Sequence, residues 1–165
     1  MNFEIRKASN EDLEDIHLLI SECYSEVNAQ IDFDGYDDDL IDIEKNYFAK
    51  GGEFILLEAN GLLIGTQSAL PFPQKNKVAL FKRLYVHKKW RGTKAAKILM
   101  EWAINWALNN KFEKIEFFSD SQSIRAHKFF NKFGFLKKEL IPASLKIPYE
   151  QYRFYGEVSS LSPFK

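Results

Sequence analysis

The amino-acid sequence predicts an α/β fold, with a mixed and mostly antiparallel central sheet of about six to seven strands and helices on both faces. Two observations lead to this prediction. In the middle of the chain, apolar runs bounded by Gly, Pro and Asn indicate strands joined as hairpins. Later, a strand, an amphipathic helix and a second strand follow closely, which indicates a parallel crossover beside the hairpins.

Length and composition indicate one globular domain over residues 1–165. Of the 165 residues, 45% are hydrophobic and 28% are charged, which suits a single domain with its own core. The 23 basic and 23 acidic side chains balance, which argues against a general nucleic-acid binder. The only cysteine, Cys23, excludes an internal disulfide and a cysteine-cluster zinc site. No stretch approaches the ~18 apolar residues of a membrane helix, and no signal region is seen, so we expect a cytoplasmic protein without a membrane partner or a metal.

The expected elements follow one another in the order β-α-α-β-β-β-α-β-α-β-β. Strands are expected at residues 3–6, 54–59, 62–70, 78–86, 114–118, 135–141 and 152–158. Helices are expected from about residue 9 to residue 27, before residue 51, after the turn at residues 91–92, and over residues 123–132.

Local signals define several of these elements. Ser9 stands three residues before Asp12, which is the spacing of a capping box. In the following helix Cys23 lies on the apolar stripe and is expected to be a small core residue. Asn60-Gly61 between apolar runs is a strong hairpin signal. In the strand at residues 78–86, alternation predicts one shared face for Ala79, Phe81, Arg83 and Tyr85.

An acidic stretch, IDFDGYDDDLIDIE at residues 31–44, precedes the first hairpin. It lacks the spacing of a calcium-binding loop. A solvated loop is the simplest interpretation. The alternative is an acidic rim that attracts a cationic substrate.

An Arg-Gly turn joins a strand to a helix within HKKWRGTKAAKILMEW, at residues 87–102. Such a junction can bind an anion, because free backbone N–H groups and the helix dipole both favour negative charge. Gly92 allows close approach of a ligand, and Arg91 and Lys94 add positive charge. A basic turn with a capping glycine is an equally simple interpretation. A third is an anion or nucleic-acid site, which the balanced net charge disfavours.

Two segments resemble the GNAT superfamily of acetyl-CoA-dependent N-acetyltransferases. Residues 79–100, ALFKRLYVHKKWRGTKAAKILM, are similar without a gap to the family's strand and the "RGkGiGraLl" pattern that opens its central helix. Residues 123–135, SIRAHKFFNKFGF, resemble the second pattern, roughly "N-x-x-A-x-x-x-Y-e-k-x-G-F". The expected element order matches the family fold over nearly the whole chain. The resemblance implies transfer of acetyl from acetyl-CoA to a primary amine of a small molecule or peptide, by direct attack in a ternary complex.

The resemblance also implies a cofactor site. The pantetheine arm would pair with the strand around residue 85, and the thioester would lie in a splay between this strand and residues 115–117, where a backbone N–H polarises its carbonyl. The pyrophosphate would lie on the Arg-Gly loop. Residues of the helix expected at 123–132 would contact the cofactor and flank its sulfur end. The implied contacts are Leu84, Tyr85 and Val86, then Arg91, Gly92, Thr93, Lys94, Ala95 and Ala96, and finally Ser123, Phe129 and Phe130.

Three positions depart from the family pattern. Lys94 replaces the second loop glycine, Leu80 stands where many members carry a glutamate base, and Phe130 stands where a tyrosine acid is usual. A protonated amine must still lose a proton before attack. Candidate bases acting through water are Asp32, Asp34, Glu53, Glu58 and Asp120. Candidate proton donors to the thiolate are Tyr85, which we favour, and Tyr155, Tyr47 and Tyr152.

Two functions therefore remain open from the sequence. The first is an active N-acetyltransferase, whose amine is expected to be cationic if the acidic stretch faces the substrate. The second is a catalytically degenerate acyl-CoA-binding or sensing module. Turnover distinguishes them. Family members often form dimers through their late strands, so a homodimer is compatible with the resemblance.

Overall fold

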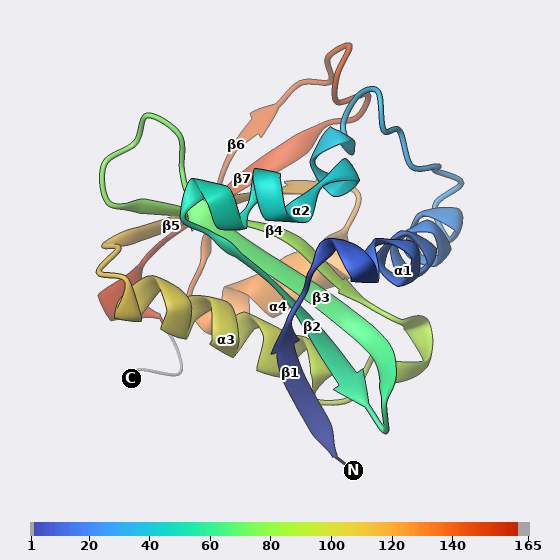
Figure 1. Ribbon diagram of the computed structural model, residues 1–165. Coiled ribbons are helices and arrows are strands. Elements are labelled where there is room, and N and C mark those ends of the chain that lie inside the picture. The colour runs from blue at the N-terminus through green and yellow to red at the C-terminus, as the bar shows by residue number, and fades with distance from the viewer. Residues whose placement is uncertain (1, 162–165) are drawn as a thin grey trace.

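A seven-stranded sheet with the strand order β1-β2-β3-β4-β5-β7-β6 forms the centre of the computed structural model, which describes residues 2–161 (Figure 1). Every neighbouring pair is antiparallel except β4 and β5. The strands are β1 (Phe3–Lys7), β2 (Glu53–Ala59), β3 (Leu62–Pro71), β4 (Val78–Val86), β5 (Lys114–Asp120), β6 (Leu136–Ile141) and β7 (Gln151–Glu157). The mixed α/β fold expected from the sequence is confirmed.

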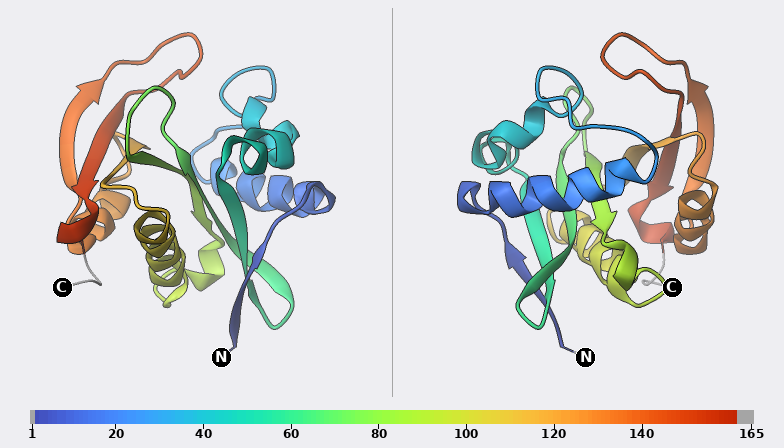
Figure 2. Two further views of the ribbon diagram at one scale, coloured as in Figure 1. Left: turned by 60° about the vertical axis from the view of Figure 1, so that its left-hand side comes forward. Right: turned by 90° about the vertical axis from the view of Figure 1, so that its right-hand side faces the viewer.

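Helices cover both faces of the sheet (Figure 2). They are α1 (Leu13–Ser25), α2 (Ile43–Asn46), α3 (Ala95–Asn109) and α4 (Ile124–Phe133). The apolar sides of α1 and α2 pack with β2 on one face, and those of α3 and α4 pack with β4, β5 and β7 on the other. Short 3-10 turns adjoin them, including η3 (Phe48–Lys50) after α2 and η4 (Lys88–Trp90) before α3. No helix within residues 2–161 has the length and apolar character needed to span a bilayer.

Local turn chemistry explains several element boundaries. The capping box is present: the Ser9 hydroxyl accepts from the N–H of Glu11, and the Asp12 carboxylate accepts from the N–H of Ser9. Asn60 and Gly61 have φ of 53° and 80°, as a tight hairpin between twisted strands requires. Gly134 ends α4 with φ of 101°. All three signals were read correctly from the sequence.

A β-bulge in β4 overturns the prediction of one shared face along this strand. Thr66 pairs with Tyr85 and Ser68 pairs with Lys82, so a single β3 residue faces two residues of β4. Arg83 adopts φ of 63° within the bulge. The expected alternation is therefore interrupted. Ala79 and Phe81 pack beneath α3 and α4, whereas Arg83 contacts the segment between α1 and α2 and Tyr85 contacts Tyr24 of α1.

The parallel pair at the centre of the sheet is short. Val78–Leu80 pairs with Lys114–Glu116, and no further β4–β5 pairing exists in the described chain, although both strands continue. β5 instead stays paired with β7 to its last residue. The two halves of the sheet thus separate beyond Leu80 and Glu116 and leave a splay between β4 and β5 (Figure 2).

Candidate active site

The loop that leads from β4 into α3 exposes backbone N–H groups. Gly92 has φ of 79°, and no atom lies within 4 Å of the place that a Cβ would take. Thr93 Oγ1 donates to the carbonyl of Trp90 at 2.5 Å and accepts from the N–H of Ala95 at 3.2 Å. The N–H of Ile98 bonds the carbonyl of Lys94 at 2.9 Å, so the amides of the turn before it have no intrahelical acceptor. Such a turn suits an anion.

The structure gives Arg91 a partner that sequence reasoning missed. Its guanidinium binds the Glu26 carboxylate at 2.6 and 2.8 Å and donates through Nε to the carbonyl of Val86 at 3.1 Å. Arg91 therefore ties the end of β4 to the end of α1. This fork holds the pKa of Glu26 below its usual range. The hydroxyl-bearing and lysine side chains of the loop, Thr93 and Lys94, are exposed.

The remaining residues expected at the cofactor have different surroundings. Val86 and Ala95 are buried, with the Val86 carbonyl bonded to Arg91 and the Ala95 N–H bonded to Thr93, and Leu84, Ala96 and Phe129 are half-buried. Phe130 is a core residue whose ring centroid lies 4.7 Å from that of Phe117 and 5.1 Å from that of Phe154. Ser123 precedes α4, and its hydroxyl makes no capping bond.

Two carboxylates of the acidic stretch, on Asp37 and Asp39, belong to a buried ion cluster. The Arg83 side chain is 2% exposed, and it binds Asp37 at 2.9 Å and Asp39 at 2.5 Å. Tyr47 also donates to Asp39. Burial acts to raise the pKa of Asp39, but the Arg83 guanidinium outweighs it, and the pKa lies below its usual value. The solvated-loop interpretation is therefore wrong for Asp37 and Asp39.

Tyr85 joins the same cluster. Its hydroxyl lies 3.3 Å from that of Tyr24 and 3.4 Å from Nη1 of Arg83. Burial raises the pKa of Tyr85, so this phenol keeps its proton at neutral pH. Tyr24 in turn donates to Asp37 at 2.7 Å. The favoured proton donor is thus held in a buried polar network, and not isolated in the splay.

Most of the proposed water-assisted bases lie away from the splay or are engaged in local structure. Glu58 pairs with Arg6, and Glu53 with Lys7, on strands β1 and β2. Asp32 accepts from the N–H of Asp34, which is itself exposed in the loop. At the end of β5, Asp120 accepts from the N–H of Gln122 at 2.8 Å.

Among the tyrosines, Tyr155 bonds Glu157 at 2.9 Å, Tyr47 is buried against Asp39, and Tyr152 lies against His127. Cys23 is half-buried, with Sγ 3.8 Å from the carbonyl of Val86, and burial raises the pKa of its thiol. It lies against the end of β4 and in none of the apolar core clusters, so the predicted core position is not confirmed.

Sequence reasoning missed Glu116. This residue lies on β5 in register with Leu80, at the last parallel pair before the splay. Its side chain is 7% exposed, and it is paired with Lys75 at 2.7 Å and with Arg153. The signal available in the sequence was a charged residue between Ile115 and Phe117 in an otherwise apolar strand. Only the register of β4 and β5 shows that this residue stands beside Leu80 at the start of the splay.

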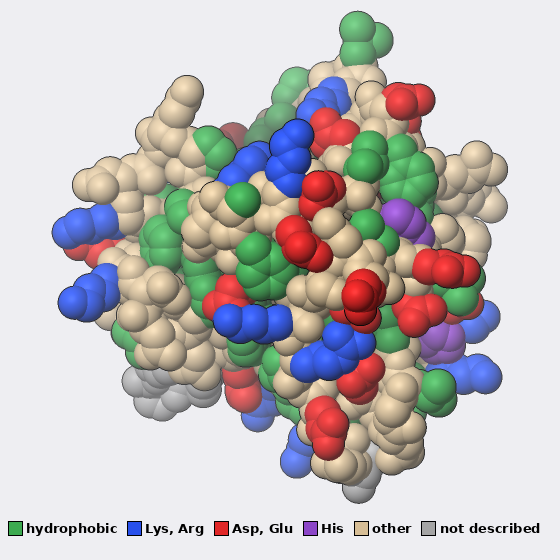
Figure 3. Space-filling view, in the orientation of Figure 1, with side chains coloured by type: hydrophobic (Ala, Val, Ile, Leu, Met, Phe, Trp, Pro, Cys, Tyr) green, Lys and Arg blue, Asp and Glu red, His purple; other side chains and the backbone are tan. Residues whose placement is uncertain are grey.

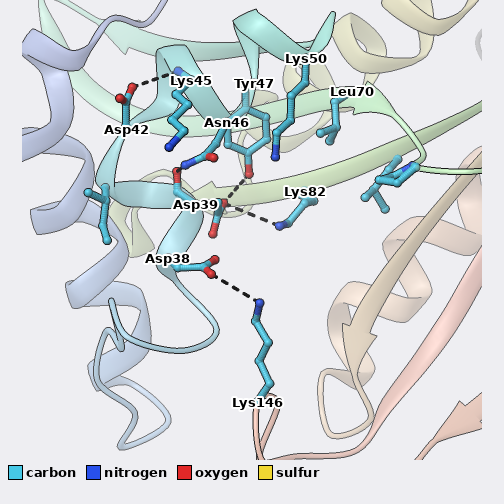
Figure 4. Close-up of a pocket in the computed structure, with 13 residues that line it drawn as sticks. Asp38, Asp39, Asp42, Lys45, Asn46, Tyr47, Lys50, Leu70, Lys82 and Lys146 are labelled. Carbon is cyan, nitrogen blue, oxygen red and sulfur yellow. Dashed lines mark hydrogen bonds and ion pairs between the residues drawn. The ribbon is translucent and has the colours of Figure 1, made fainter.

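A pocket of about 570 Å³ opens over β4 on the face that carries α2 (Figure 4). Leu80 and Lys82 of β4 form its floor, and the β6–β7 loop contributes Lys146. Its lining consists of Asp38, Asp39, Ile41, Asp42, Lys45, Asn46, Tyr47, Lys50, Leu70, Pro73, Leu80, Lys82 and Lys146. Because Leu80 and Lys82 stand where β4 leaves β5, the pocket adjoins the splay. Its volume suits a small molecule.

Comparison with known proteins identifies the family. The model of the acetyltransferase (GNAT) family matches residues 13–135. A GNAT-family acetyltransferase from Staphylococcus aureus Mu50 is 25% identical, with a TM-score of 0.84, and the alignment covers 95% of this chain and 99% of that one. An acetyltransferase from Streptococcus agalactiae is 23% identical, with a TM-score of 0.82 and coverage of 94% and 98%.

A third structure, yncA from Salmonella typhimurium with its cofactor acetyl-CoA, shares the fold at 16% identity, with a TM-score of 0.73 and coverage of 94% of each chain. A search of curated proteins gave no significant match. The family match spans most of the chain, including the loop before α3 and the second motif in α4. The chain therefore belongs to the acetyltransferase (GNAT) family and is an acyltransferase.

Proposed function

We propose that the protein is an N-acetyltransferase that moves the acetyl group of acetyl-CoA to a primary amine of a small molecule or peptide. One observation carries the proposal: the splay between β4 and β5 borders the amide-rich loop before α3 and adjoins the pocket over Leu80 and Lys82. A donor and an acceptor can therefore meet at one point from opposite sides. The similar fold of yncA, which was solved with acetyl-CoA, supports this choice of cofactor.

In this proposal the pyrophosphate lies on the loop at Arg91–Ala96, where backbone amides and the positive end of α3 favour it. The pantetheine arm extends β4 by pairing with Leu84–Val86. The free hydroxyl of Ser123 and the half-buried ring of Phe129 approach the cofactor from α4. Phe130 supports that wall from the core and does not need to touch the ligand.

The acetyl transfer proceeds in a ternary complex. The neutral amine attacks the thioester carbonyl carbon, a C–N bond forms, the C–S bond breaks, and coenzyme A leaves as a thiolate. A backbone N–H near Tyr85 or Val86 stabilises the oxyanion of the tetrahedral intermediate. No protein nucleophile is required, because the amine itself attacks.

Two protons must move during this reaction. Leu80 offers no carboxylate on β4, but Glu116 stands beside it on β5 and is our candidate for removing a proton from the amine through water. Tyr85 is our candidate for returning a proton to the thiolate, directly or through Tyr24. Tyr85 lies in β4 and Glu116 in β5, so the two groups come from opposite sides of the splay.

The test is release of free thiol from acetyl-CoA against amines of different classes, including polyamines, aminoglycosides, amino acids and lysine peptides. Gly92→Trp is expected to abolish release, because the indole would fill the phosphate-binding loop. Gly61→Trp is the matched control: Gly61 has φ of 80° and equally open surroundings, but it lies in the β2–β3 hairpin. Loss of activity in both variants, or in neither, would contradict the assignment of the loop.

The second candidate function is a degenerate acyl-CoA-binding module. Leu80 and Phe130, which lack the groups that the family usually carries there, favour it. This function predicts that calorimetry detects binding of acetyl-CoA by the native protein but not by Gly92→Trp. It also predicts that no amine causes release of thiol. The oligomeric state is a separate question, and a homodimer stays a prediction that light scattering can test.

A further inference from the structure

The pocket over β4 is lined by four lysines and three aspartates, and the aspartates are already engaged. Asp39 binds Arg83 and Tyr47. Asp42 caps α2 by accepting from the N–H of Lys45 at 3.0 Å, and it also accepts from Asn10 at 2.9 Å. The third, Asp38, faces Lys146 at 3.5 Å.

The lysines are less well compensated. The Lys82 ammonium has Asp39 as its nearest carboxylate, at 3.8 Å, and that carboxylate already accepts from Arg83 and Tyr47. Lys45 and Lys50 are exposed, and neither ammonium has a carboxylate in ion-pair contact within residues 2–161. Figure 4 shows Lys50 and Lys82 on one side of Tyr47 and Lys45 beyond Asn46 on the other, and all three line the same pocket. This space is short of negative charge.

The wider surface does not restore an acidic rim. On the face that carries α1 and α2, Lys and Arg side chains lie intermixed with Asp and Glu side chains (Figure 3). Asp37 and Asp39, at the centre of the acidic stretch, are turned inward to Arg83. Asp32, Asp34 and Glu44 of the stretch are exposed but do not line the pocket, so the carboxylates that the stretch brings to the pocket are the three that are already engaged.

We propose that the acceptor carries an anionic group, a carboxylate or a phosphate, which binds Lys82 together with Lys45 and Lys50 while its amine points to the splay. Lys82 lies two residues beyond Leu80, where β4 stops pairing with β5, so a small acceptor bound there reaches the thioester. A partly buried ammonium, 30% exposed in its side chain, binds an anion more strongly than a fully solvated one. This inference rests on the proposed acetyl transfer, since it names the substrate class of the same site.

The test uses pairs of amines that differ only in the anionic group. Lysine is compared with cadaverine, and phosphoethanolamine with ethanolamine, in the thiol-release assay. The anionic member of at least one pair is expected to have a KM about 10- to 100-fold lower, because a charge-assisted contact contributes that much to binding. The pair that shows the preference identifies carboxylate or phosphate. An equal KM within both pairs, or a lower KM for cadaverine or ethanolamine, would overturn the inference.

Three variants locate the contact. Lys82→Met and Lys50→Met are expected to raise KM for the anionic acceptor by about 10-fold or more. The KM of the amine without the anionic group is expected to change little. Lys82→Arg restores the cation and is expected to recover much of the affinity. Lys132→Met, in an exposed position at the end of α4, is the control and is expected to change neither value. Equal effects of the lysine variants on both members of a pair would indicate a structural role only.

Calorimetry separates this inference from the proposed function. With the protein saturated in coenzyme A, the same amine pairs are titrated without any turnover. Selective binding of the anionic member that weakens in Lys82→Met supports the inference even if no thiol is released, in which case the acetyl transfer alone is wrong. Thiol release from amines without selective binding supports the acetyl transfer and overturns the inference. Absence of binding by either anionic amine also overturns it.

Discussion

Arg83→Met tests whether the buried ion cluster organises the face on which the pocket lies. The variant keeps a long apolar side chain but removes the cation that binds Asp37 and leaves Asp39 with Lys82, 3.8 Å away, as its remaining cation. Both are largely buried, with side chains 2% and 11% exposed. Removing one partner from a buried ion pair costs about 3–5 kcal/mol, because the remaining charge is desolvated and unpaired. For a chain of this length the melting temperature is expected to fall by about 6–20 °C.

The pH dependence gives this prediction a sign that simple loss of packing cannot reproduce. In the native protein the pKa of Asp39 is below its unfolded value, so its contribution is present above that value and is lost as the pH falls through the folded pKa. In Arg83→Met, the desolvation of Asp39 is opposed only by the Tyr47 hydroxyl and by Lys82 at 3.8 Å, and we expect it to raise the folded pKa above the unfolded one. The folded state then binds the extra proton, and the variant becomes more stable as the pH falls from 7 toward 5.

The measurement is the free energy of unfolding by urea at pH 7 and pH 5. Arg6→Met is the control, since Arg6 pairs with Asp12 but is 45% exposed, and the expected loss is no more than about 1 kcal/mol. If Arg83→Met does not fold, the triple change with Asp37→Asn and Asp39→Asn removes the unpaired charges and is expected to restore folding. A loss equal to that of Arg6→Met, or lower stability of Arg83→Met at pH 5 than at pH 7, would refute the reasoning.

Three further predictions concern the reaction. Glu116→Gln is expected to lower kcat about 100-fold or more while KM for acetyl-CoA stays constant, and an unchanged kcat in steady-state assays would exclude it as the base. Tyr85→Phe is expected to lower kcat and to alter the alkaline limb of the pH–rate profile, because burial keeps this phenol protonated; an identical profile would mean that the thiolate leaves unaided. Arg91→Met is expected to raise KM for acetyl-CoA and to make that KM depend less steeply on salt concentration than in the native protein. If Arg91 acts only through its contact with Glu26, the KM is expected to be the same in Glu26→Gln and in Arg91→Met.

The parts of the fold that depend on local signals were predicted from the sequence. The hairpin at Asn60-Gly61 follows from the need for two residues at positive φ, and the start of α1 follows from the Ser9–Asp12 capping box. The loop before α3 is similar, since Gly92 at φ of 79° is a property of a few adjacent residues. The contact between Arg91 of this loop and Glu26 was not predictable, because Glu26 lies at the end of α1, far away in the sequence.

The charge of the substrate side was not predictable, since tertiary contacts bury two of its aspartates against an arginine. A row of aspartates at residues 37–39 has the same composition whether it faces solvent or a buried arginine. Only the fold brings Arg83 against Asp37 and Asp39, which turns this part of an expected solvated loop into an internal ion cluster. Alternation along β4 gave the wrong face for Arg83, because a rule of period two holds only while the strand has no inserted residue.

The bulge in β4 connects these findings. An extra residue near Arg83 turns its side chain to the pocket side and takes the backbone out of register with β3. Carbonyls that lose their ladder partners in this way need other donors. Thr66 Oγ1 donates to the carbonyl of Arg83 at 2.8 Å, and Ser68 Oγ donates to that of Lys82 at 2.7 Å. These two hydroxyls thus stabilise the bulge at Lys82–Tyr85, just beyond the last β4–β5 pair at Leu80, and they come from β3, which lies on the opposite side of β4 from the splay.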